Sequence, residues 1–216
     1  MKKSQKELST LDINSFDEMD PSLSEGHRPL FDKEVPFELR IAQSANNSAD
    51  LGTIENIRVK VLLLGEEDSP QEFKIQLTSD TDLFFNYIHI TDEHHYRELQ
   101  EEQKFTVNYS EFGAMIMRMM NSAIKQPNVF LCVLMLQKDG TARLDLLQNI
   151  DYKFIELLSL DFYASGEDSV RQQITYRYNL TRALYNQTQA KLKQISSSLK
   201  AKNPSLLMQV QKSIHK

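Results

Sequence analysis

Hydrophobic and polar residues alternate, or form short apolar runs, in a series of segments between Leu30 and Phe162. Alternation is typical of a strand with one face on a core and the other in water, while short apolar runs indicate buried strands. The turn Lys138–Gly140 separates two such segments and indicates a hairpin. The strands predicted by this pattern span residues 30–41, 58–64, 72–78, 84–90, 104–109, 129–137, 142–148 and 154–162.

Two segments in the same region show helical spacing instead. Residues 91–103 read as a short helix capped by Thr91, and residues 110–125 as an amphipathic helix capped by Ser110. The apolar stripe of the second helix consists of Phe112, Met115, Ile116, Met119 and Ala123, whereas Met117 and Met120 fall off it and are candidates for an exposed binding face. The order of elements predicts an α+β fold, a mostly antiparallel, barrel-like sheet with two helices.

A long helix follows the break at Gly166, with acidic residues at its start and lysines at its end. Its apolar positions alternate in steps of four and three, which is the coiled-coil period. The predicted seam is Ile174, Tyr178, Thr181, Tyr185, Thr188, Leu192, Ile195 and Leu199. Two threonines and two tyrosines make this seam weak. The expected organisation is a disordered tail (1–28), a globular head (29–164), a coiled-coil-like helix (166–202) and a short C-terminal helix (203–216).

Composition and charge exclude several classes of partner. The 216 residues carry a net charge of −5 with acids and bases interspersed, which lacks the basic stripe that nucleic acid demands. No apolar stretch approaches the roughly 20 residues of a membrane span. Cys132, the single cysteine, lies in an apolar run and is expected to be a buried thiol in a reducing compartment. We therefore expect a cytoplasmic protein that binds neither nucleic acid nor membrane.

Candidate chemistry is sparse. His89, His94 and His95 cluster in sequence, but adjacent residues of a helix point in different directions and no third ligand converges with them. Asp80 and Asp82 read as a turn in which side chains bond to nearby backbone amides. None of the familiar phosphate-binding, nucleophile or metal motifs occurs. We expect no catalytic residue, no cofactor and no metal site.

One feature calls for a function, an aromatic pair in the connection before the last strand of the head. Tyr152 and Phe154 stand in the stretch Gln148 to Leu160. Because connections lie at the surface, such a side chain either packs on its own sheet or is held out for a partner. The residues alone leave both possibilities open.

Three blocks of the head occur in a recognisable order: LTSDTDLFFNYIHI (77–90), TDEHHYRELQEEQKFTVNYSEFGAMI (91–116) and IDYKFIELLSLDFYASGEDSVRQQI (150–174). With the opening strand LFDKEVPFELR, they resemble the globular head of the spindle-assembly-abnormal six family, the centriolar cartwheel proteins. The resemblance covers about Leu30 to Ile174. It suggests a short member of that family that lacks the long coiled coil.

The resemblance implies a mechanism of self-assembly. Such proteins dimerise in parallel through the coiled coil, and heads of neighbouring dimers meet when one aromatic enters an apolar pocket of the other head. Tyr152 matches that aromatic, so the implied head–head interface includes Tyr152, Lys153 and Phe154. The expected partners are the chain itself and other centriolar or cytoskeletal proteins. The expected location is a centriole, a basal body or a related cytoskeletal structure.

Two functional hypotheses follow. The first is a non-enzymatic, self-assembling scaffold. The alternative is a monomeric or dimeric adaptor that binds a helix or peptide, through the methionine-rich face of residues 115–120, without polymerising.

Overall fold

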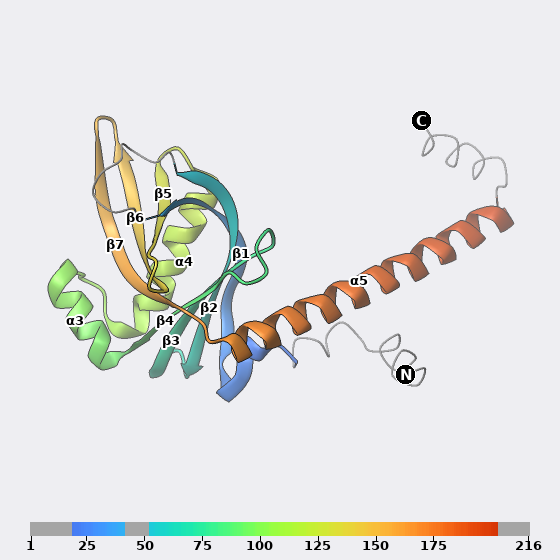
Figure 1. Ribbon diagram of the computed structural model, residues 1–216, viewed down its shortest axis with the longest axis horizontal. Helices are drawn as coiled ribbons and strands as arrows, with labels where there is room; N and C mark the ends of the chain where they lie inside the picture. The colour runs from blue at the N-terminus through green and yellow to red at the C-terminus, as the bar shows by residue number, and fades with distance from the viewer. Residues whose placement is uncertain (1–18, 42–51, 203–216) are drawn as a thin grey trace. The chain divides into compact units, whose positions relative to one another are not determined.

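The head is a closed barrel of seven strands in the computed structural model, which describes residues 19–41 and 52–202 (Figure 1). Neighbours around the barrel follow the order β1, β2, β3, β4, β7, β6, β5, and all pairs are antiparallel except β1 with β5. The strands are β1 (Arg28–Ile41), β2 (Thr53–Gly65), β3 (Pro70–Ser79), β4 (Asn86–Asp92), β5 (Phe130–Leu136), β6 (Thr141–Ile150) and β7 (Lys153–Ala164). The predicted α+β class is confirmed.

Alternation along the strands sends one set of apolar side chains into a shared core. Val59 and Val61 on β2, Ile75 on β3 and Leu144 on β6 are fully buried. Helix α4 (Tyr109–Lys125) adds its apolar face to this core. Gly113 allows the close approach, because a Cβ there would stand only 2.5 Å from a ring carbon of Phe73.

Methionines on α4 differ from the expectation. Met120, expected off the apolar stripe, is fully buried, because Phe112, Ile116 and Met120 form an i, i+4 row against the barrel. Met115, Met117 and Met119 are partly buried and pack against the same core. Most of the methionine side chains that the adaptor hypothesis needs on the surface therefore pack against the core of the head.

Both helix starts differ from prediction by a residue or two. Helix α3 (Glu93–Gln103) is capped by Asp92, whose Oδ1 accepts from the amide of His95 at 2.8 Å, while Thr91 is buried. Helix α4 is entered through Asn108, whose amide donates to Glu111 Oε2 at 3.2 Å. The side chains of Asp92 and Glu111 bond the helix starts in place of the expected hydroxyl caps, because they lie where the backbone turns into each helix.

The predicted strand over 104–109 is wrong. Lys104 takes a left-handed conformation with φ 60° and ends α3, and the segment continues as an irregular link into α4. The carbonyl of Val107 accepts bonds from Tyr96 Oη at 2.7 Å and Gln100 Nε2 at 2.8 Å. Phe105 and Val107 pack against the core. Phe105 and Val107 alternate with polar residues because both pack inward from a loop. Side chains of α3 bond this loop, and it pairs with no strand.

The expected disordered tail of residues 1–28 is wrong at its end. Residues Pro21–Gly26 form a 3₁₀ turn, η1. Ser22 within this turn and His27 directly after it are buried. Lys60 Nζ on β2 donates to Ser22 Oγ at 3.1 Å, and His27 Nε2 lies 3.0 Å from Glu72 Oε1. Polar contacts with the barrel thus order a segment whose composition is poor in apolar residues. The rest of that tail (1–18) and the expected C-terminal helix (203–216) lie outside the described residues.

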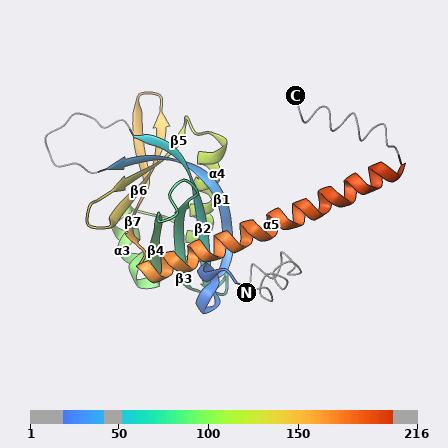
Figure 2. The ribbon, with the colours of Figure 1, turned by 45° about the vertical axis from the view of Figure 1, so that its right-hand side comes forward.

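Helix α5 (Glu167–Lys202) occupies the range predicted for the long helix (Figure 2). Up to Ile174 it belongs to the same compact unit as the barrel, and from Thr175 onward it belongs to a second unit. No helix in residues 19–41 and 52–202 combines the length and apolarity needed to cross a bilayer. Cys132 is buried as expected, and burial raises the pKa of its thiol to about 12.

Candidate interaction site

A tight turn at the tip of the β6–β7 hairpin displays Tyr152. The turn contains only Asp151 and Tyr152, and Asp151 takes a left-handed φ of 48°, a conformation that aspartate tolerates better than most residues. The Tyr152 side chain is 102% exposed, so the ring projects fully into solvent. Figure 1 shows the hairpin tip at the top of the head. The alternative in which this ring packs on its own head is wrong.

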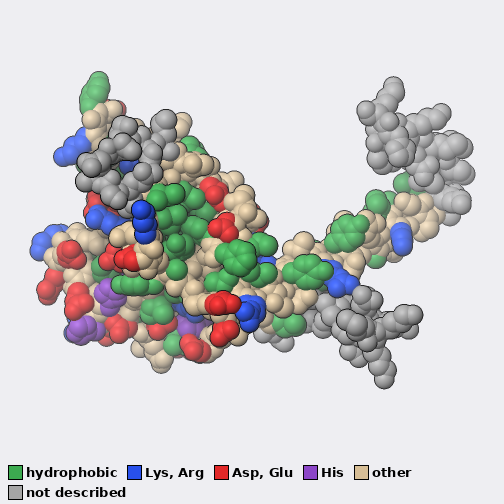
Figure 3. Space-filling view, in the orientation of Figure 1, with side chains coloured by type: hydrophobic (Ala, Val, Ile, Leu, Met, Phe, Trp, Pro, Cys, Tyr) green, Lys and Arg blue, Asp and Glu red, His purple; other side chains and the backbone are tan. Residues whose placement is uncertain are grey.

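Further apolar side chains surround the base of this aromatic. Ile150, Phe154 and Ile155 are 46%, 54% and 40% exposed, and Lys153 is exposed beside them. In the space-filling view, a hydrophobic group stands out into solvent at the tip of the hairpin (Figure 3). An apolar group displayed on a short turn, with apolar neighbours, is typical of a surface that binds another protein.

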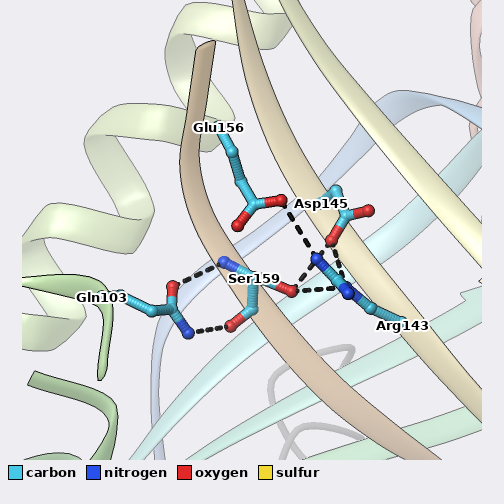
Figure 4. Close-up of polar contacts among 5 residues, drawn as sticks. All are labelled: Gln103, Arg143, Asp145, Glu156 and Ser159. Atoms are coloured by element: carbon cyan, nitrogen blue, oxygen red, sulfur yellow. Dashed lines mark hydrogen bonds and ion pairs between the residues drawn. The ribbon is translucent and has the colours of Figure 1, made fainter. Parts of the chain in front are cut away.

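A polar network braces the hairpin below its tip (Figure 4). Arg143 Nε on β6 donates to Asp145 Oδ1 at 2.7 Å and to Ser159 Oγ at 2.8 Å, and its Nη2 donates to Glu156 Oε2 at 3.0 Å. Ser159 Oγ in turn donates to Asp145 Oδ1 at 2.9 Å. The bond to Asp145 raises the pKa of Arg143 further. These bonds join β6 and β7 on either side of the register shift that lies between Leu146 and Leu147.

Gln103, the last residue of α3, takes the place of a missing strand partner. Strand β4 pairs with β7 only at Tyr87 with Ala164 and Ile88 with Tyr163. Beyond that point the Gln103 amide bonds both backbone groups of Ser159: its Oε1 accepts from the amide at 2.8 Å and its Nε2 donates to the carbonyl at 2.7 Å. The hairpin is therefore tied to α3 along an edge that lacks backbone pairing with β4.

The three sequence-predicted histidines do not converge on a ligand site. His89 is buried, donates through Nδ1 to the carbonyl of Asp161 at 2.7 Å, and accepts through Nε2 from the hydroxyl of Thr91. His95 Nδ1 lies 3.2 Å from the carbonyl of Ile90, and exposed His94 lies 3.7 Å from Glu98. Within the described part of the chain, no three His, Cys, Asp or Glu side chains are placed to hold a metal ion.

Burial gives His89 a pH-dependent role in stability. Desolvation is the main cause that lowers the pKa of its imidazole to about 4, from 6.5. The unfolded chain therefore binds this proton at a higher pH than the folded chain does. The free energy of unfolding should fall as pH drops from about 6.5 to about 4, by about 3 kcal/mol from this group. Urea denaturation at stepwise pH measures this loss.

The variant His89→Asn supplies the control for that titration. It removes the buried titrating group, so the slope between pH 6.5 and 4 should flatten relative to the parent protein. A slope that is unchanged in the variant would assign the acid sensitivity to other groups.

The loop between β3 and β4 is the turn expected around Asp80 and Asp82. Ser79 Oγ accepts from the amides of Thr81 at 3.0 Å and Asp82 at 3.1 Å. Asp82 Oδ1 accepts from the amide of Phe84 at 2.9 Å. Sequence reasoning missed that this turn displays an aromatic, since Phe84 is 77% exposed. The signal available was the pair Phe84-Phe85, of which an alternating strand can bury only one.

The predicted seam of α5 faces solvent in the single chain. Tyr178, Tyr185, Leu192 and Ile195 are between 57% and 63% exposed, and Thr181 and Thr188 are exposed as well, while Ile174 and Leu199 are half-buried. Thr188 Oγ1 donates to the carbonyl of Leu184 at 2.8 Å, so this seam hydroxyl is satisfied within its own helix. The face is thus available to a second helix.

Comparison with known proteins identifies relatives of the head. A family sequence model described as the centriolar protein SAS N-terminal domain, SAS-6_N, matches residues 29–162. A comparison with curated proteins gave no sequence match.

Solved structures of SAS-6 fragments share the fold. A mutant N-terminal fragment of Leishmania SAS-6 with part of its coiled coil matches with a TM-score of 0.68 and 17% identity, covering 83% of this chain and 98% of that one. A Drosophila melanogaster Sas-6 fragment dimerised via the coiled-coil domain matches with a TM-score of 0.67 and 14% identity, covering 91% and 93%. An N-terminal coiled-coil dimer of C. elegans SAS-6 matches with a TM-score of 0.59 and 15% identity, covering 78% and 98%.

Proposed function

Since this chain belongs to the family of the centriolar protein SAS N-terminal domain, we propose that it is a non-enzymatic, self-assembling scaffold of the centriole or basal-body cartwheel, or of a related cytoskeletal ring. Two contacts build the assembly. Heads join through Tyr152, and chains dimerise in parallel through α5. The full exposure of Tyr152 at the hairpin tip is the observation that carries the proposal. Dimeric fragments among the solved relatives support the second contact.

Magnitudes limit the strength of the head–head contact. Burying one aromatic ring removes roughly 150–250 Å² from water, which is on the order of 4–6 kcal/mol at most. Association itself costs about 4–15 kcal/mol. The partly exposed Ile150, Phe154 and Ile155 add to the contact, but a single pair of heads remains weakly bound. Each dimer offers two heads, so several weak contacts act together once chains are joined through α5.

The side-chain bonds that hold the β6–β7 hairpin suit its proposed role in the head–head contact. A weak contact tolerates little additional cost for ordering its own surface. Gln103 and the Arg143 network hold the strands of the hairpin before any partner arrives, so less ordering of the backbone that carries Tyr152 is left to the contact itself. Ring closure also demands a fixed angle between the two contacts, because a chain of alternating contacts that fails to close gives an open helix.

Association of the full chain as a function of concentration tests the proposal. Sedimentation velocity from low to high micromolar concentration should give dimers first and then larger species. Negative-stain electron microscopy of the concentrated sample should show curved or closed assemblies. A protein that stays monomeric throughout, or that stops at the dimer, would favour the adaptor alternative. Imaging of a tagged protein tests the proposed location at centrioles or basal bodies.

A further inference from the structure

A second aromatic is displayed on the head, at the β3–β4 loop. Leu83 is 47% exposed and Phe84 is 77% exposed, although the next residue, Phe85, is buried with its ring 4.9 Å from that of Tyr87. The Ser79 and Asp82 bonds described above fix the backbone on both sides, and Glu55 accepts from the hydroxyls of Ser79 and Thr81. A loop this strongly bonded presents Phe84 in a defined position, at the cost of leaving a large apolar group in water.

This loop lies beside the point where the chain leaves the barrel. Tyr87, at the start of β4, pairs with Ala164 at the end of β7, and the amide of Ser165 donates to the carbonyl of Asn86 at 2.8 Å. Tyr163, 62% exposed, lies at the same end of the barrel. Figure 1 shows the green loop between β3 and β4 standing out from the barrel. The start of α5 and the loop belong to one compact unit.

The proposed dimer needs more contact than its seam offers. The seam holds only about three to four heptads, with threonine and tyrosine at half of its places. Charge adds to the difficulty: after Asp168, residues 169–202 contain seven basic residues and no acidic one (Arg171, Arg177, Arg182, Lys191, Lys193, Lys200 and Lys202). Two such helices in parallel repel one another. A dimer built from the seam alone is therefore poorly stabilised.

We propose that the patch formed by Leu83, Phe84 and Tyr163 docks the first part of α5 from a second copy of this chain. The inference rests on the proposed parallel dimer. In a parallel, in-register pair the partner helix begins about 8–10 Å from the start of α5, which puts it within reach of the loop. Its arginines, Arg171 and Arg177, then meet the acidic rim of the loop, Asp80 and Asp82. The docking offsets both the weak seam and the repulsion.

A head that grips the partner's helix has a further consequence for assembly. If heads are joined to a coiled coil through a free linker, each head can rotate relative to the helices. The angle between the head–head contact and the helix contact is then undefined. A patch on the head that holds the partner helix fixes that angle. The Phe84 contact would thus determine whether neighbouring dimers close into a ring or continue as a helix.

Dimerisation measured with the head–head contact removed tests the docking. All proteins carry Tyr152→Glu, and sedimentation equilibrium of the full chain gives the dimer Kd. Adding Phe84→Ala should raise that Kd about tenfold or more, as expected for an interface aromatic. The matched control is Ile124→Ala, which truncates an apolar residue at the end of α4, 36% exposed and outside the patch. It should leave the Kd within about twofold.

The outcomes separate the docking from the proposed function. A Tyr152→Glu parent that dimerises with an unchanged Kd after Phe84→Ala overturns the docking and leaves the dimer intact. A parent that never dimerises overturns the parallel dimer, and the docking with it. A photo-crosslinking benzoylphenylalanine at position 84 gives positive evidence in mixtures of ¹⁴N and ¹⁵N chains. Cross-links to residues 171–185 of the other copy support the docking, and cross-links confined to one chain overturn it.

Discussion

Replacing Tyr152 with glutamate is expected to abolish head–head association while leaving the head folded. The ring is 102% exposed, so the substitution breaks no intramolecular contact and should change the free energy of unfolding by less than about 0.5 kcal/mol. At the interface the variant loses the buried ring and must desolvate a carboxylate. We expect the head–head Kd to rise at least about 100-fold, which for a weak contact is complete loss. Sedimentation velocity should show dimers and no larger species.

Two further variants make this result interpretable. Tyr152→Phe keeps the ring and removes only the hydroxyl, so assembly should persist, and should strengthen if that hydroxyl is left unpaired in the socket, at a cost of about 1–3 kcal/mol. Ile90→Glu places the same charge on an exposed apolar site away from the tip and should leave assembly intact. A Tyr152→Glu protein that is folded and still forms larger species would show that the heads meet elsewhere.

The strands of the barrel could be predicted from the sequence because each follows a local pattern of alternating or continuous apolar residues. Runs such as Arg58–Leu64 and Arg143–Leu147 either alternate or stay apolar, and the turn at Lys138–Gly140 joins two of them. Each of these signals lies within a few residues. Tyr152 could be singled out from its place in a connection and from the family resemblance, but the residues alone did not decide whether its ring is buried. Its full exposure follows from the tight turn that the structure shows.

The missed features depend on contacts between distant segments. Gln103 and Ser159 are 56 residues apart, and nothing local indicates that a helix-end amide completes the edge of a strand. Phe105 and Val107 alternate as a strand would, but the side chains of α3 hold that segment as a loop. Met120 was misassigned because the width of a buried helical stripe depends on how closely the helix approaches the sheet. Gly113 permits that approach because it has no Cβ, which would otherwise meet the ring of Phe73 on the facing strand.

The two proposed contacts contribute unequally to assembly. Heads joined only through Tyr152 form isolated pairs, because each head then has a single partner. A dimer through α5 gives every particle two heads, so a second head–head contact forms at an effective concentration set by the first. Removing the helix contact should therefore cost far more than the energy of that contact alone.

Placing charged residues on the seam tests whether the α5 contact is required for larger assemblies. The double variant Leu192→Lys, Ile195→Lys puts two lysines on exposed seam positions, beside Lys191 and Lys193 of a helix that is already basic. Helix propensity changes little, but two apolar contacts per chain become like-charge contacts across the dimer. We expect the dimer Kd to rise at least about 100-fold and larger assemblies to disappear. Head–head pairs should survive at high concentration, where sedimentation equilibrium can detect them.

The matched control places the same two charges on the opposite face of the helix. Ala190 and Ser197 are exposed and lie five residues beyond the seam positions Tyr185 and Leu192, so Ala190→Lys, Ser197→Lys adds equal charge outside the seam. Because the control raises the net charge of the helix by the same amount, general repulsion affects both variants equally. If the control weakens dimerisation as strongly as the seam variant, net charge governs the association and the assigned seam is wrong. If neither variant does so, α5 is not the dimer contact, and the Tyr152 contact alone cannot produce a ring.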